Sequence, residues 1–480
     1  MPQLHEMSAA ELVGRMAKKE LSPVELVDHF LDRVSGIDPV VRSYVTLDHD
    51  GVRREAKQAE QRVARGEPLG PLHGLPVSVK DLIVTKGIRT TRGSRMFEHD
   101  VPSFDAPVVA RLKKAGAIVF GKTNTSEFGW KGATSNLIFP ETRNPWNLAY
   151  SPGGSSGGAA AGVACGLAPV AIGTDGGGSI RIPAAFTGLF GFKPSLGRWP
   201  VFPASGVGPL SHIGPIARSV SDAALLDYVL SGFDERDCYS AAESPHLSGF
   251  GSLSNLKIGW SPDLGFMRLD SEMAALVETA VPSLEGLGHR IIPLKLDIGD
   301  PTDTVVTYFA AGAAAAVADQ PNWKNKVDPG LCELVEKHAG LSAVDYARAQ
   351  LERASFYAKV AAIFDEVDLI VTPTVPVTGF KLGLDGPWAI GGSEVDRIRW
   401  LGLTSLFNLT GHPAASLPIG FSSIGLPVGL QIVGPRGRDR FVLQACKEIE
   451  TIFDTPRHWP PAAKIEDGSK VTNALWLSDV

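Results

Sequence analysis

The sequence contains few cysteines and none of the short motifs that bind metal ions. Its four cysteines, at positions 165, 238, 332 and 446, include no C-x-x-C pair, so neither a disulfide framework nor a zinc site is expected. There is also no H-E-x-x-H motif and no clustered set of histidines and acids, which argues against a catalytic metal. We therefore expect reduced thiols, typical of a cytoplasmic protein, and neither a metal ion nor an organic cofactor.

A basic excess, a signal peptide pattern and a long apolar run are absent as well. The 46 lysines and arginines face 52 acidic residues, a net charge of −6, which argues against nucleic acid as a partner. The N-terminus has no basic start followed by an apolar run, as a signal peptide has. No apolar stretch approaches the roughly 20 residues that a membrane span needs. These absences predict a cytoplasmic location.

What the sequence does contain is an alternation of helical and strand-like segments. Apolar runs typical of strands lie at 74–84, 117–121, 169–173, 256–260, 290–294, 369–374, 415–419 and 428–433. Helical patterns between them predict an α/β sheet covered on both faces. No linker divides the chain and no repeat has a fixed period, so we interpret residues 1–480 as a single domain. Residues 300–361 look mainly helical and read as an insertion.

Three segments carry residues that could do chemistry. Lys80 lies within the apolar run 74–84, either at an exposed edge or buried, and burial would lower the pKa of its amine until it accepts a proton near neutral pH. Residues 151–158 read SPGGSSGG, a flexible linker or a close backbone approach. Residues 173–183 read GTDGGGSIRIP. Their glycines are typical either of a tight turn or of an oxyanion hole with Ser179 at its end.

Other interpretations of these glycines are weaker. There is no G-x-x-x-x-G-K-[ST] motif, and no G-x-G-x-x-G follows a strand with an acid about 20 positions on, so nucleotide sites are not expected. Gly153, Ser155 and Gly157 do match the G-x-S-x-G nucleophile elbow of α/β-hydrolases. That fold needs a downstream histidine, and the flanks of the one candidate, His412, read as a turn. A Ser155–His412 pair is therefore disfavoured.

Taken together, the ordered motifs resemble those of the amidase signature family. They are LHGLPVSVKD at 72–81, GKTN at 121–124, SEF at 126–128, RNPW at 143–146, the two serine segments, GFKP at 191–194, and the tail segments 408–420 and 425–431. The resemblance implies a large mixed, mainly parallel β-sheet sandwiched between helical layers. It also implies an amidase signature core at 60–232, with the 300–361 insertion shaping the substrate pocket.

The resemblance implies a catalytic role for three residues. Ser179 corresponds to the nucleophile, Ser155 to a proton-relay serine that follows a cis peptide bond, and Lys80 to the base. A serine hydroxyl is a poor nucleophile until a base takes its proton, and a neutral Lys80 could draw one through Ser155. The N–H groups of residues 176–179 would then hold the oxyanion.

Four glycines are expected to bind substrate, namely Gly129, whose backbone faces the substrate in relatives, and Gly176, Gly177 and Gly178 of the oxyanion turn. Relatives often carry threonine at position 176, so glycine there predicts a wider acyl site. Trp130 and Lys131 fill a stretch where relatives have smaller residues, and Trp130 is either a pocket wall or a core tryptophan. Specificity is expected to lie in 199–208 and 300–381, which carry Phe202, Tyr308, Phe309 and Trp323.

The sequence thus predicts a serine amidohydrolase that cleaves C–N acyl bonds of small amides through an acyl-enzyme. Esters, aryl amides and carbamates, the substrates of a urethanase, are further candidate substrates. The first alternative is the glutaminase subunit of a tRNA-dependent amidotransferase, which shares the triad and feeds ammonia to a partner subunit. The second is a non-catalytic binding protein on the same fold. A small-molecule substrate is the expected partner, and a homodimer is left open.

Overall fold

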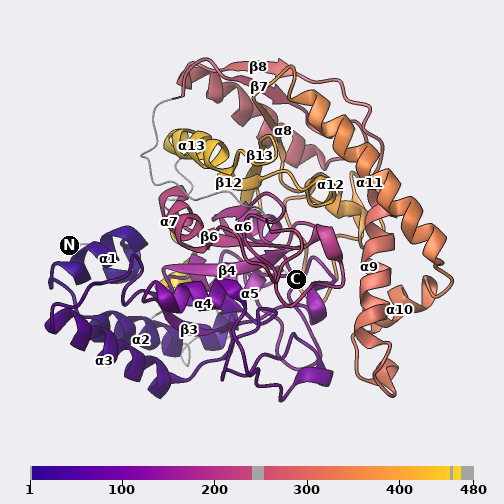
Figure 1. Cartoon of the computed structure of the whole chain (residues 1–480). Helices are drawn as coiled ribbons and strands as arrows, with labels where there is room; N and C mark the ends of the chain where they lie inside the picture. Colours follow the sequence, from indigo (N-terminus) through magenta and orange to yellow (C-terminus); the bar gives the residue numbers. More distant parts are fainter. Residues whose placement is uncertain (1–2, 241–252, 454–457, 466–480) are drawn as a thin grey trace.

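The fold is built on one sheet of eleven strands, which runs through the middle of the molecule (Figure 1). The computed structural model describes residues 3–240, 253–453 and 458–465. The strand order is β1-β3-β2-β4-β6-β5-β12-β13-β9-β7-β8. The strands of this sheet are β1 (Tyr44–Thr46), β2 (Pro76–Lys80), β3 (Ile118–Thr123), β4 (Val170–Asp175), β5 (Phe190–Lys193), β6 (His212–Ala217), β7 (Lys257–Trp260), β8 (Arg290–Pro293), β9 (Leu369–Pro373), β12 (Ala414–Phe421) and β13 (Pro427–Val433). A separate pair joins β10 (Ala389–Ile390) and β11 (Ser393–Glu394).

Helices cover both faces of the sheet, as the sequence predicts. They are α1 (Ala9–Ala17), α2 (Pro23–Val41), α3 (His49–Ala64), α4 (Pro107–Lys114), α5 (Gly157–Ala164), α6 (Arg181–Thr187), α7 (Val220–Leu230), α8 (Ser271–Ala280), α9 (Thr302–Val317), α10 (Pro329–Lys337), α11 (Ala343–Ile363), α12 (Gly402–Thr410) and α13 (Asp439–Ile449). Helices α5 and α6 contact each other and the sheet, while α4, α7 and α13 form a second contacting group. Helices α9, α10 and α11, in orange, lie together at one side of the molecule (Figure 1).

The sheet is mixed, but the expectation that it is mainly parallel is wrong. Within the described residues, six of its ten neighbouring pairs are antiparallel, and four are parallel. The sequence pattern missed β5 and β6, which are short, lie beside each other and pair antiparallel. It also did not specify that β12 and β13 form an antiparallel hairpin across the short loop at 422–426. Such a loop suffices for antiparallel neighbours, whereas parallel ones need a long crossover.

The parallel pair β2 and β4 positions the candidate site. Every residue of β2 is buried, as is all of β4 except the half-buried Thr174, and apolar runs of this kind suit strands that are covered on both faces. Val79 pairs with Ile172, so Lys80, the last residue of β2, lies beside the end of β4. Parallel strands present their carboxyl ends at one edge, where sites on open α/β sheets commonly form.

Helix α5 explains how the neutral 151–158 segment is held. All eight of its residues, GGAAAGVA, are buried, and a helix that is apolar all round belongs in the interior. Its small side chains let it lie close to β2, β4 and β6. The segment before it is therefore packed backbone, and the flexible-linker alternative is wrong.

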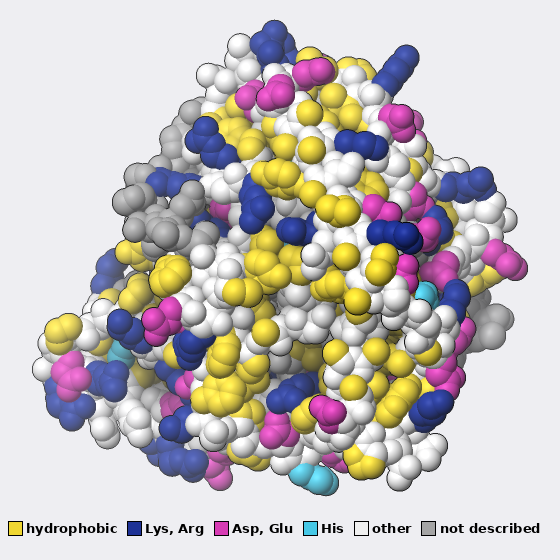
Figure 2. Space-filling view, turned by 45° about the vertical axis from the view of Figure 1, so that its right-hand side comes forward, with side chains coloured by type: hydrophobic (Ala, Val, Ile, Leu, Met, Phe, Trp, Pro, Cys, Tyr) yellow, Lys and Arg dark blue, Asp and Glu magenta, His cyan; other side chains and the backbone are white. Residues whose placement is uncertain are grey.

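The surface shows no dominance of one charge. On the face in Figure 2, lysine and arginine side chains are interspersed with aspartate and glutamate, and hydrophobic side chains gather around a central recess. All four cysteines are free, and only Cys238 is exposed. Within the described ranges, none of the helices has the length and apolar character that crossing a membrane requires.

Candidate active site

Lys80 is fully buried at the end of β2. Its Nζ lies 2.7 Å from Ser155 Oγ and 2.8 Å from Thr174 Oγ1. Burial lowers the pKa of the Lys80 ammonium well below its ordinary value, and the negative charge of Asp175 opposes this only in part. Desolvation disfavours a charged amine when no carboxylate bonds to it directly. The amine is thus within hydrogen-bond distance of Ser155, and its lowered pKa would allow it to exchange a proton with that hydroxyl.

The two serine segments lie side by side. The Gly154–Ser155 peptide bond is cis, as the resemblance implies. The next residue, Ser156, donates its backbone N–H to the carbonyl of Ser179 over 3.1 Å. Ser155 and Ser179 both line the same cavity. The structure therefore brings together the three residues that the sequence singled out for chemistry.

The turn that carries Ser179 is organised around one carboxylate, that of Asp175. This side chain accepts hydrogen bonds from the backbone N–H groups of Gly178, Ile180 and Arg181. The Arg181 guanidinium binds it through Nε and Nη2, and both side chains have zero exposure. Burial by itself raises the pKa of the Asp175 carboxyl, but Arg181, together with the charge of Lys193 and the hydrogen bond from Asn408, holds that pKa below its usual value.

Helix α12 locks this turn from the other side. Asn408 donates to both the backbone and the side-chain oxygens of Asp175, and Thr404 donates to the Gly177 carbonyl over 2.6 Å. Arg181 also donates to the Thr404 carbonyl and to the side-chain oxygens of Asn408 and Gln431. Because a buried charge needs all its partners satisfied, this network fixes the position of the turn.

Gly178 has a structural role that the sequence did not indicate. Its φ is +130°, and a Cβ there would lie 2.3 Å from Thr404 Oγ1, so no larger residue fits. Its N–H is donated to Asp175 over 2.7 Å, and it does not line the cavity as Gly176 does. The Gly178 N–H is therefore already bonded to Asp175, whereas the contribution of the Gly176, Gly177 and Ser179 N–H groups to an oxyanion hole stays a prediction.

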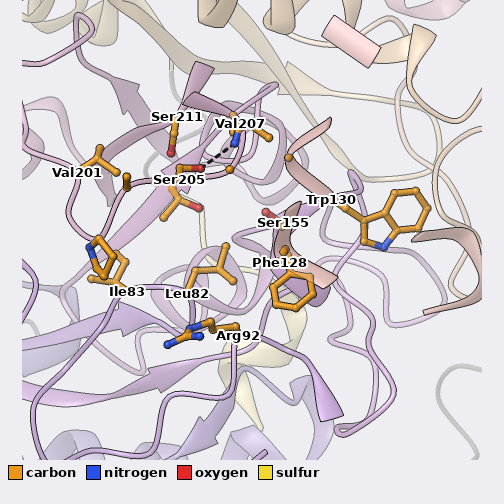
Figure 3. A pocket seen from close by; sticks show the side chains of 18 of the residues that line it. Leu82, Ile83, Arg92, Phe128, Trp130, Ser155, Val201, Ser205, Val207 and Ser211 are labelled. Atoms are coloured by element: carbon orange, nitrogen blue, oxygen red, sulfur yellow. Dashed lines mark hydrogen bonds between the residues drawn. The ribbon is translucent and has the colours of Figure 1, made fainter. Parts of the chain in front are cut away.

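The cavity in front of the serines holds about 400 Å³ and is mostly apolar (Figure 3). Its walls come from the loop after β2, the segment 128–130, the loop 201–207 and helices α9 and α10. Among the described lining residues Arg92 alone is charged, and its guanidinium is engaged by Asp100 at 3.0 Å and by the Phe97 ring at 4.0 Å. The one charged side chain in the described wall is thus already paired with an acid.

The comparisons with known proteins agree with this geometry. The chain matches the family described as Amidase over residues 25–443. It is 36% identical over 458 residues to an acylamidase of Rhodococcus erythropolis, covering 94% of this chain and 96% of that protein. The structure is similar to the crystal structure of a bacterial aryl acylamidase of the amidase signature enzymes, with a TM-score of 0.88, 33% identity and coverage of 97% of this chain and 99% of the other. The chain belongs to the amidase signature family. It is an amidase, a hydrolase of carbon–nitrogen bonds.

A second group of relatives is equally similar in sequence. The amidase is also 36% identical over 490 residues to a glutamyl-tRNA(Gln) amidotransferase subunit of Desulforapulum autotrophicum, covering 93% of this chain and 97% of that protein. Overall identity therefore does not separate a stand-alone amidase from an amidotransferase component, and the walls of the cavity have to be compared instead.

The structure of the amidase places several of the single residues that the sequence analysis named. Gly129 lines the cavity, and a Cβ on it would be 3.0 Å from Ser155 Oγ. Trp130, Phe202 and Phe309 line the cavity too, whereas Tyr308 and Trp323 do not.

His412 has a structural environment far from that of a catalytic base. It hydrogen-bonds Thr410 and stacks on two rings, those of Tyr357 and Phe364. Burial lowers the pKa of His412 to about 3. Its contacts among the described residues do not include Ser155, which bonds Lys80 instead. The nucleophile-elbow alternative is therefore not supported.

The sequence interpretation missed the residues that support the serines. Thr174 and Asp175 were part of the quoted motif, and a polar pair directly after an apolar strand was the available signal. Thr404 and Asn408 gave no local signal, because their partners lie more than 220 positions away. Among the described residues no group of three or more histidines, cysteines or acids is arranged to hold a metal ion.

We expect the Asp175→Asn variant of the amidase to unfold far more easily than the parent at pH 7. The change leaves the buried Arg181 without its counter-charge, and breaking such a pair costs about 3–5 kcal/mol. Urea unfolding followed by circular dichroism measures the loss. Because the folded pKa of Asp175 lies below the unfolded value of about 3.9, the difference between parent and variant should shrink as the pH falls below about 4.

The matched control is Glu336→Gln, which breaks the exposed pair between Lys324 and Glu336. Such pairs contribute at most about 1 kcal/mol. Equal, small losses in both variants would contradict the organising role of Asp175.

Proposed function

We propose that the protein is a serine amidase that cleaves small amides with apolar or aryl groups through an acyl-enzyme. In this proposal Ser179 is the nucleophile, Ser155 the relay and Lys80 the base. The observation that carries it is the buried Lys80 amine 2.7 Å from Ser155 Oγ, beside an apolar cavity that both serines line.

The proposed reaction uses the chain's own groups. Neutral Lys80 takes a proton from Ser155 as Ser155 takes one from Ser179, and Ser179 Oγ attacks the amide carbonyl carbon. The N–H groups of Gly176, Gly177 and Ser179 stabilise the negative charge that develops on the carbonyl oxygen. The relay then returns the proton to the leaving nitrogen as the C–N bond breaks. Water, activated along the same route, hydrolyses the acyl-enzyme and restores Ser179.

The lining of the cavity supports an apolar substrate over glutamine. Glutamine carries an ammonium and a carboxylate, and burying them without partners is unfavourable. Arg92 is the one charged lining residue among those described, and it is engaged by Asp100. We therefore favour a stand-alone amidase over the glutaminase subunit, although the sequence identities to the two groups are equal.

In this proposal, the two regions in which specificity is expected, 199–208 and 300–381, shape the cavity. Helix α9 of the 300–361 insertion contributes Phe309, and the 201–207 segment contributes Phe202 and Val207. A Cβ on Gly176 would lie 3.6 Å from Val207 and 3.8 Å from Phe309. Glycine at 176 thus leaves the space between these walls free, which suits a bulky or planar acyl group.

Ser179→Ala should abolish amide hydrolysis without changing the melting temperature, because the variant loses the attacking oxygen and little packing. A fluorophosphonate should label the parent at Ser179, as peptide mass spectrometry would show. Labelling at another serine, with activity retained in the variant, would contradict the assignment.

Replacing Lys80 by methionine should lower kcat/KM for amides by about 10²–10⁴-fold, since the side-chain volume stays and the amine is lost. The base must be unprotonated, so the parent's kcat/KM rises with pH as Lys80 loses its proton. The increase in kcat/KM should occur at a lower pH than the ordinary pKa of a lysine, and it should be absent from the Lys80→Met variant. Activated esters should lose less activity than amides because their leaving groups need less protonation.

The control for this experiment is Lys122→Met. Burial lowers the pKa of Lys122 to about 8, yet its Nζ bonds Ile83, Thr85 and Thr90 and neither serine. The Lys122→Met variant should keep the increase of kcat/KM with pH, even if its melting temperature is lower than that of the parent. If the increase of kcat/KM with pH disappeared in Lys122→Met and remained in Lys80→Met, the proposed role of Lys80 would be overturned.

A substrate panel separates the two candidate functions. Aryl amides such as p-nitroanilides should be hydrolysed by the purified chain alone, and glutamine should be turned over far less efficiently. Esters and carbamates belong in the same panel, with Ser179→Ala as the blank. Efficient glutamine hydrolysis, or activity only with a second subunit, would favour the glutaminase.

A further inference from the structure

Trp130 lies between two cavities of the molecule. It lines the 400 Å³ cavity beside the serines, and it also lines a second cavity of about 200 Å³ on the other side. Its side chain is only 5% exposed. In Figure 3 its ring lies at the edge of the pocket, with Ser155 and Phe128 between it and Leu82. Trp130 therefore borders both cavities.

Helix α9 runs past both cavities. Its first turns, at Thr302, Asp303 and Val306, line the second cavity, and its later turns, from Phe309 to Ala316, line the first. These positions recur at helical spacing, so one face of α9 borders both spaces. The two cavities thus lie end to end along this face and form one groove with a partition.

The partition is the Trp130 ring, which packs against Gly330 of α10. A Cβ on Gly330 would lie 2.6 Å from the Trp130 ring, so glycine is what allows the ring to pack against the helix. The next residue, Leu331, faces the first cavity, while Gly330, Glu333 and Leu334 face the second. Removing the indole would therefore connect the two spaces directly.

The two spaces differ in chemical character. The first is apolar, whereas the second is bordered by charged groups that include Asp303, Lys337 and the Arg397–Glu333 pair at 3.0 Å. The Trp130 Nε1–H is buried and has no hydrogen-bond partner among the described residues. Leaving a buried donor unsatisfied is unfavourable, so its own hydrogen bonding does not explain why the ring sits there.

We propose that Trp130 is a specificity-determining residue that limits the length of the substrate arm on its side of Ser155. Gly129, one residue before it, lines the same cavity as Ser155, and a Cβ on it would lie 3.0 Å from Ser155 Oγ, so we place this limit close to the scissile bond. The second cavity, of about 200 Å³, is large enough to admit an extension of the substrate chain. This proposal rests on the proposed amidase function and specifies which linear amides the site accepts.

The test compares the parent with Trp130→Ala on two series of linear amides. One series lengthens the acyl chain on p-nitroaniline, and the other lengthens the N-alkyl chain on a fixed acyl group. In the parent, kcat/KM should fall steeply beyond a certain length in one series. In the variant the fall should come at a longer chain length, with a clear gain for the longest chains relative to the shortest. An unchanged length limit in both series would overturn the proposal.

Two controls distinguish an opened partition from general loosening. Leu331→Ala enlarges the first cavity alone and should leave the length limit in place. Adding Val306→Trp to Trp130→Ala refills the second cavity from α9 and should restore the parent's limit. An extended limit in Leu331→Ala, or one that persists in the double variant, would overturn the proposal. A parent that hydrolyses no amide would instead overturn the proposed function, and the two failures are distinguishable.

Discussion

The carboxylate of Asp175 is the group on which the rest of the site depends. It gathers three backbone N–H groups of one turn, a guanidinium and an amide from α12. Burying an ion pair of this kind adds little net stability, because desolvation offsets much of the attraction. Its effect lies in specificity of structure, since only one arrangement of the turn satisfies all the partners. Ser179 and the free N–H groups beside it inherit their positions from that arrangement.

A second constraint is the low polarity around Lys80. The ends of β2 and β4 lie in a fully covered part of the sheet, so the Lys80 ammonium loses its hydration. The nearest acid, Asp175, is already satisfied by Arg181 and gives Lys80 no direct ion pair. One buried network therefore positions the turn that carries Ser179 and, because Arg181 occupies the acid, leaves burial to lower the pKa of Lys80. Asp81 follows Lys80 directly in the chain, but its carboxylate accepts hydrogen bonds from the backbone and the side chain of Thr91 rather than from Lys80.

The walls and the floor of the cavity are built from residues of different size. The floor consists of small residues of the two serine segments, Ser155, Gly176 and Ser179, with Thr174 at the end of β4. The walls are large side chains from the 128–130 segment, the 201–207 loop and the helices α9 and α10. A change in the floor disturbs the chemistry, whereas a change in the walls alters the shape of the space. This division allows one fold to serve relatives as different as an acylamidase and an amidotransferase component.

The local features of this amidase could be predicted from its sequence. Apolar runs marked β2, β3 and β4, the glycine-rich segments marked the two serine turns, and Lys80 stood out as a charge inside a strand. These signals are local because strand burial and tight turns depend on neighbouring residues. The directions of the strands, the bond from Gly178 to Asp175 and the clamp from Thr404 and Asn408 became visible only in the folded chain. So did the position of Trp130 between two cavities along α9. The strand directions, the clamp and the position of Trp130 involve groups far apart in the chain, and side-chain types alone do not specify which distant partner each will contact. The bond from Gly178 to Asp175 spans only three residues, but it depends on a backbone conformation with a φ of +130° that the sequence did not specify.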